Sequence, residues 1–217
     1  MIPLKDDNPR LRPPIFTVGL IAINVVAFYF EIQFGLNEVV YQYGAIPSHI
    51  VELQNLETLL TSMFLHGGFL HLGGNMLYLW IFGDNIEGYL GHSRFLVFYF
   101  LCGFVAVFTH IFLSGISDTP MVGASGAISG LLGAYLVKYP KAKVLVVIPI
   151  VCFLMIRKIP AFVVLGLWFV IQLFYGLSSL GISQGGGVAF WAHIGGFAAG
   201  ILLIYLFPAK KLRISSS

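Results

Sequence analysis

Four polar side chains lie in stretches of sequence that are otherwise apolar, and their types suit acyl-transfer chemistry. His71 and Asn75 are four residues apart, Ser125 lies in a Gly-Ala-Ser-Gly run, and His193 lies in an Ala-His-Ile-Gly-Gly run. A serine becomes a nucleophile when a histidine within hydrogen-bond reach accepts its proton, and nearby donors stabilise the oxyanion that forms. The sequence therefore predicts Ser125 as nucleophile and His193 as base. His71 and Asn75, which share one face of a helix, are predicted to donate hydrogen bonds to the oxyanion.

Each of these residues also has a structural explanation. A serine in a helix can bond back to a carbonyl one turn earlier, and a histidine or asparagine can join two helices. The surrounding small residues favour a functional pair, because they recur every four positions: Ser125, Ser129 and Gly133 in one segment, Gly196 and Gly200 in the other. That spacing lets two helices approach closely, as a Ser–His hydrogen bond of about 2.6 to 3.2 Å requires.

The composition is that of a membrane protein. Of the 217 residues, 58% are hydrophobic and 10% are charged, and the mean hydropathy is +0.91. The net charge of +3 is small and scattered, so no nucleic-acid surface is expected. Cys102 and Cys152 stand alone in apolar runs, and no HExxH pattern occurs, so no disulfide framework, metal or cofactor is expected.

A spanning helix needs about 20 apolar residues, and helices are the structures that satisfy their backbone in lipid within one segment. Six stretches qualify, namely 15–34, 66–83, 95–113, 121–137, 161–180 and 188–207. The sequence therefore predicts an all-α, six-helix bundle over 15–207, with terminal tails at 1–14 and 208–217. A seventh apolar run, 144–156, is shorter and contains Pro149, and we expect it to lie at the interface without crossing.

The basic residues predict the orientation of the bundle. All twelve Lys and Arg fall in the two tails, at Arg94 or in the 138–158 region, whereas the predicted outer loops contain none. The positive-inside rule then places both termini in the cytoplasm, and we expect the cell membrane as the location. The second, fourth and sixth helices consequently begin at the outer face, where their polar residues can meet. The same orientation puts Asp84 and Asp118 on opposite sides, which excludes a di-aspartyl site.

Three motifs resemble those of the rhomboid family of intramembrane serine proteases. They are the run from His66 to Asn75, the Gly-Ala-Ser-Gly run at Ser125, and the Ala-His-Ile-Gly-Gly run at His193. The resemblance implies a rhomboid-like bundle in the lipid bilayer whose Ser125 and His193 cleave transmembrane protein substrates. It also implies that His71, Asn75 and the Ser125 N–H form the oxyanion hole.

One position departs from the resemblance. Some family members have an aromatic residue that packs on the catalytic histidine, and this chain has Ser129 there. The sequence thus leaves open what holds the His193 ring. Trp168 and the other aromatic residues of 161–180 are interpreted either as lipid-facing residues or as a lateral gate for substrate. The alternative to an enzyme is a membrane scaffold that binds other transmembrane helices.

The predicted orientation is testable by cysteine labelling. Because the outer loops lack Lys and Arg, Ser117→Cys and Gln184→Cys should react with an impermeant thiol reagent added outside intact cells, whereas Ala142→Cys should not. Labelling of Ala142→Cys from the outside would contradict the six-helix arrangement.

Overall fold

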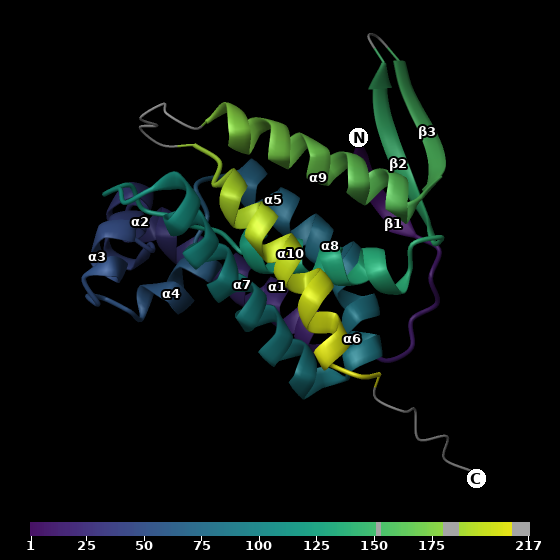
Figure 1. The fold of residues 1–217 in the computed structure, drawn as a ribbon, viewed down its shortest axis with the longest axis horizontal. Helices are drawn as coiled ribbons and strands as arrows, with labels where there is room; N and C mark the ends of the chain where they lie inside the picture. The colour runs from purple at the N-terminus through teal and green to yellow at the C-terminus, as the bar shows by residue number, and fades with distance from the viewer. Residues whose placement is uncertain (151–152, 180–186, 210–217) are drawn as a thin grey trace.

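The computed structural model describes residues 1–150, 153–179 and 187–209. Its described part is a helical bundle with a small antiparallel sheet beside it (Figure 1). The first helical elements are α1 (Ile15–Phe34), α2 (Leu36–Tyr43), α3 (Pro47–Val51), α4 (Thr58–Thr61) and the 3-10 turn η1 (Ser62–Phe64). The others are α5 (Phe69–Tyr78), the π-helical η2 (Leu79–Gly83), α6 (Asp84–Leu90), α7 (His92–Ser114), α8 (Ser125–Lys138), α9 (Ala161–Ser178) and α10 (Phe190–Leu206).

Three described helices, α1, α7 and α9, are long and apolar enough to cross a membrane. The helix α10 is apolar but has 17 residues, and α5, η2 and α6 follow one another as a continuous helical backbone with a π-helical middle. The 14 residues of α8 reach about 21 Å at 1.5 Å per residue, less than the hydrocarbon thickness of about 30 Å. All six predicted stretches therefore contain helix, and six complete crossings remain a prediction.

The all-α prediction is wrong for the run 144–156. This run forms β2 (Lys143–Ile150) and β3 (Phe153–Pro160), and β1 (Ile2–Asp6) from the predicted N-terminal tail pairs with the other edge of β2. All three strands are antiparallel, with Ile2 opposite Val147 and Val147 opposite Ile156. The residues are rich in Val and Ile, which favour strands, and the run is too short to span lipid as a helix. A hairpin satisfies this backbone by pairing it with itself and with the chain terminus.

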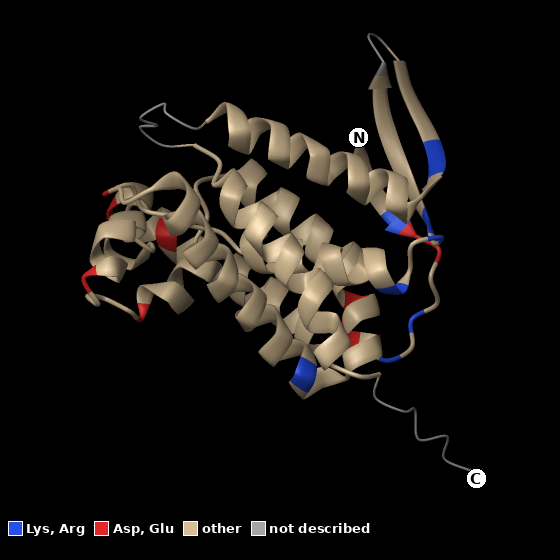
Figure 2. Ribbon diagram, in the orientation of Figure 1, with Lys and Arg blue, Asp and Glu red and all other residues tan. Residues whose placement is uncertain are grey.

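Parts of several predictions lie outside the described residues. They are residues 151–152 of the run 144–156, with Cys152 among them, residue 180 of the predicted helix 161–180, residues 181–186 of the loop after it, and residues 210–217 of the C-terminal tail. Among the described residues, Figure 2 shows Lys and Arg gathered where α8 ends, α9 begins and α7 starts. The opposite end, formed by α2, α3 and α4, shows acidic residues and no described basic one. This distribution agrees with the charge bias from which the orientation was predicted.

The helix α8 runs through the middle of the bundle, and ten of its residues are buried. It packs on α10 through glycines, because a Cβ added at Gly196 would collide with the carbonyl oxygen of Gly126 and one at Gly200 with that of Gly130. The packing row on α8 is therefore Gly126 and Gly130, joined by Gly133 against the Phe197 carbonyl. The predicted residues Ser125, Ser129 and Gly133 also face α10, and Gly126 and Gly130 beside them make the backbone contacts that the prediction did not name.

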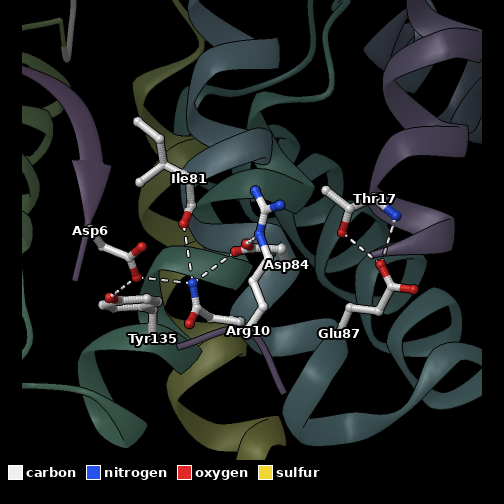
Figure 3. Close-up of polar contacts among 8 residues, drawn as sticks. Asp6, Arg10, Thr17, Ile81, Asp84, Glu87 and Tyr135 are labelled. Carbon is white, nitrogen blue, oxygen red and sulfur yellow. Dashed lines mark hydrogen bonds and ion pairs between the residues drawn. The ribbon is translucent and has the colours of Figure 1, made fainter. Parts of the chain in front are cut away.

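The start of α1 is held by a carboxylate from another helix. Glu87 of α6 is fully buried and accepts hydrogen bonds from the backbone N–H of Phe16 and Thr17, at 2.9 and 2.8 Å. The Thr17 hydroxyl donates to the same carboxylate at 2.7 Å (Figure 3), and His92 lies 2.6 Å from it. These N–H groups have no partner within α1, and the positive end of the helix dipole favours the negative charge. Glu87 thus fixes the start of α1 to α6.

A second polar network beside it ties the N-terminal strand to the bundle (Figure 3). Asp6 of β1 accepts hydrogen bonds from Asn85 and from the hydroxyl of Tyr135 on α8. Burial raises the pKa of Asp6, and the Tyr135 hydrogen bond opposes that rise. Arg10 contacts the buried Asp84 at 2.8 Å. Residues of the predicted tail at 1–14 therefore bind to the ends of the helices that are predicted to face the cytoplasm.

The glycine contact between α8 and α10 gives a stability prediction. Gly200→Ala should lower the unfolding midpoint in detergent, because overpacking against a backbone carbonyl typically costs about 1 to 3 kcal/mol. Gly166→Ala on α9 is the matched control, since a Cβ there meets no atom within 4 Å and alanine favours helix. Equal midpoints for the two variants would contradict close packing at Gly200.

Candidate active site

The four predicted residues come together at one cavity of about 1080 Å³. Ser125 from α8, His193 from α10, and His71 and Asn75 from α5 all line it. The helix packing described above brings the start of α10 against the start of α8, and His71 and Asn75 of α5 border Gly123, just before α8. Residues separated by 118 positions in the sequence, from Asn75 to His193, therefore share one site.

A hydrogen bond at this site joins the predicted nucleophile and base. His193 Nε2 lies 2.8 Å from Ser125 Oγ. Ser125 is the first residue of α8, so its backbone N–H has no partner within the helix. The predicted helix start at 121 was too early, because Met121 pairs with Ala45 and Gly123 adopts a φ of +122°. This extended entry delivers Ser125 to the cavity on the first helical turn.

His71 presents a hydrogen-bond donor toward the entry of α8. The Gly67 backbone N–H donates to His71 Nδ1 at 3.2 Å, so Nδ1 must carry a lone pair. In the neutral ring the proton then resides on Nε2. A Cβ added at Gly123 would lie 2.8 Å from this Nε2 and 3.6 Å from Asn75 Nδ2. Gly123 therefore leaves a small space that both donors border.

Asn75 supplies the second donor at this space. Its side chain is 7% exposed, and its Nδ2 has no hydrogen-bond partner among the described residues. A buried amide without a partner costs free energy unless a ligand or water completes it. The unpaired Nδ2, the His71 Nε2–H and the first-turn N–H of Ser125 are thus the donor types that an oxyanion hole needs.

Two residues of α9 contact the His193 ring, and the sequence analysis assigned neither of them to the site. Gln172 Oε1 lies 2.8 Å from His193 Nδ1, and the Trp168 ring lies 5.9 Å from the His193 ring with an interplanar angle of 35°. Ser129 instead donates its hydroxyl to the Ser125 carbonyl at 2.6 Å. The signal for Gln172 was present, because a glutamine inside an apolar span is a costly residue.

The remaining histidines that the sequence singled out have other contacts. His66 donates its backbone N–H to both oxygens of Glu31, at 3.1 and 3.0 Å, and its ring packs edge-on against His71 at 5.1 Å. It therefore positions the chain before α5. His110 lies 3.3 Å from Ser114 Oγ and borders the cavity.

The arrangement defines a helical membrane protein with a hydrogen-bonded serine and histidine at an internal cavity. The family model described as the Rhomboid domain matches residues 53–210, a region that contains all four predicted residues. The chain belongs to the rhomboid family.

Curated relatives carry rhomboid names. Rhomboid protease GluP of Bacillus subtilis is 36% identical over 127 residues, or 57% of this chain and 24% of GluP. RHOMBOID-like protein 4 of Arabidopsis thaliana is 38% identical over 67% of this chain and 32% of its own length. Rhomboid protein 1, mitochondrial, of Saccharomyces cerevisiae is 26% identical over 89% of this chain and 53% of the yeast protein. The chain thus spans between about a quarter and about half of these relatives.

The space at Gly123 gives a prediction for the reactivity of Ser125. Gly123→Ala should slow covalent labelling of Ser125 by a fluorophosphonate, because the methyl group would fill the space between His71 and Asn75, where the phosphonyl oxygen is predicted to bind. Loss of one such donor interaction typically costs about 100- to 1000-fold, and the labelling rate measures it.

A matched control separates this effect from backbone strain. Gly68 also has a positive φ, of +153°, but a Cβ there meets no atom within 4 Å. Gly68→Ala should therefore destabilise the protein while folded molecules label at the normal rate. Equal labelling rates for Gly123→Ala and the parent protein would show that the oxyanion is bound elsewhere.

Proposed function

We propose that this rhomboid-family protein is an intramembrane serine endopeptidase that cleaves transmembrane segments of other membrane proteins. The observation that carries the proposal is the 2.8 Å contact between His193 Nε2 and Ser125 Oγ at the wall of a cavity. A nucleophile hydrogen-bonded to its base is the diagnostic geometry of covalent acyl-transfer catalysis. GluP, a relative by sequence, is named a protease.

In the proposed reaction, Ser125 Oγ attacks the carbonyl carbon of a substrate peptide bond while His193 Nε2 accepts the hydroxyl proton. The tetrahedral intermediate collapses when the C–N bond breaks, and the imidazolium gives that proton to the leaving amine. An acyl ester on Ser125 remains. Water then attacks the ester carbonyl, again giving a proton to His193, and the carboxylic product leaves as Ser125 regains its proton.

The negative charge on the tetrahedral oxygen is proposed to be stabilised by His71 Nε2–H, Asn75 Nδ2–H and the Ser125 N–H. Support comes from the Gly67 hydrogen bond, which fixes the His71 tautomer, and from the unpaired amide of Asn75. Donors held in place before the reaction stabilise charge as it develops, which is why they act on the transition state more than on bound substrate.

We also propose that six helices cross the membrane, with both termini in the cytoplasm and the site open to the opposite side. The separation of basic residues from the α2–α4 end supports this orientation (Figure 2). For location we propose the cell membrane, although the yeast relative is named as mitochondrial. The substrates would be transmembrane proteins, and neither a metal nor another cofactor has a role in the proposed reaction.

The proposed reaction depends on two side chains with little packing role. Ser125→Ala and His193→Ala should each abolish cleavage of a single-span reporter in proteoliposomes, and their unfolding midpoints should stay close to that of the parent protein. Removing either member of a nucleophile–base pair costs most of the catalysed rate. Ser129→Ala is the control, since that hydroxyl bonds to the α8 backbone. Cleavage that persists in Ser125→Ala would favour the scaffold alternative.

A further inference from the structure

We propose that Gln172 is a positioning residue that sets the tautomer of His193 and thereby makes it a base. This inference rests on the proposed function. Gln172 lies on α9 and is 9% exposed, and its Oε1 is 2.8 Å from His193 Nδ1. It is the one polar side chain among the five buried residues of α9.

The hydrogen bond determines where the imidazole proton resides. An amide oxygen can only accept, so Nδ1 must carry the proton when it contacts Gln172 Oε1. The neutral His193 ring then has its lone pair on Nε2, the atom 2.8 Å from Ser125 Oγ. With the proton on Nε2 instead, the ring could not accept a proton from Ser125, so the tautomer selected by Gln172 is the active one.

Trp168 completes the support from the same helix. Trp168 and Gln172 are four residues apart, which places both on one face of α9. The Trp168 ring packs against the His193 ring in a tilted arrangement, with 5.9 Å between the ring centres, and Trp168 also packs against Phe197 one turn along α10. The ring and the acceptor together fix both the plane and the rotation of the imidazole, a task that Ser129 on α8 does not perform.

The origin of this support on α9 has a functional consequence. Ser125 and His193 are held together by α8 and α10, whose backbones touch at glycines. The groups that orient His193 are carried by a third helix, which has a largely exposed surface (Figure 1). The competence of the base therefore depends on α9 being packed against α10. Since the acceptor is a neutral amide, it orients the imidazolium but adds no negative charge beside it.

The test compares two substitutions of nearly equal size at position 172. Gln172→Met removes the acceptor, and Gln172→Glu keeps an acceptor oxygen in the same place whether or not the carboxyl is protonated. The proposal predicts that Gln172→Met lowers kcat by about 10- to 100-fold with little change in KM, while Gln172→Glu retains most of the activity. The rate of fluorophosphonate labelling at Ser125 should fall in parallel for Gln172→Met, because it reports the same base.

A packing role for Gln172 predicts the reverse order. Methionine would then preserve activity by filling the same volume, and glutamate would be the damaging change because it buries a carboxyl group. Ile171→Met, one residue away and 42% exposed, is the control and should behave as the parent protein. Gln172→Leu replaces Gln172→Met if the methionine variant does not fold.

The outcomes separate the two levels of the proposal. Full activity in the apolar variant, or a loss of activity in Gln172→Glu as large as in Gln172→Met, overturns the positioning role. Ser125→Ala is measured alongside. If Ser125→Ala abolishes cleavage while Gln172→Met cleaves normally, the positioning role fails and the proposed function stands. If Ser125→Ala still cleaves, the proposed function itself fails.

Discussion

The close contact of α8 with α10 is the constraint on which the rest of the structure depends. Gly196 and Gly200 meet the carbonyls of Gly126 and Gly130 so closely that neither position has room for a Cβ. The preceding residue, Gly195, faces Thr109 of α7 in the same way. Without apolar driving force between helices in lipid, such packing is a main source of helix association. It brings the first turn of α8 and the start of α10 within one hydrogen bond of each other.

The other helices are arranged around this pair, and each adds a different property to the site. The entry to α8 passes Gly123, which lets the chain approach His71 and Asn75 on α5. The helix α9 adds the acceptor and the aromatic ring that contact His193. At the other end, Glu87 and Asp6 connect the N-terminal strand, α1 and α6 through buried and partly buried hydrogen bonds. A site assembled from α5, α8, α9 and α10 thus relies on polar contacts at both ends of the bundle.

Buried polar groups in this protein fall into two kinds. Glu87, Glu31 and Asp6 have their hydrogen bonds made by the protein itself and hold segments together. Asn75 instead keeps an amide donor unpaired at the cavity. Since an unsatisfied buried donor is costly, the first kind stabilises the fold and the second is retained at a cost to stability. Unpaired buried atoms also occur elsewhere among the described residues, at Tyr99 and Asn24, so the position of Asn75 at the cavity, beside Gly123, is what marks it as a candidate donor.

The sequence by itself indicated the membrane class, the helical stretches, the charge bias and four candidate site residues, because each is a local property of composition or motif. It misassigned the run 144–156, since a strand pairing with Ile2–Asp6 depends on residues about 140 positions away. It predicted the close approach of these two helices but did not name Gly126 and Gly130 as contact residues, because spacing alone does not show which backbone atoms meet. Gln172 and Trp168 could be assigned to His193 only in the tertiary structure. Two helices must pack side by side before an amide on one can orient a ring on the other.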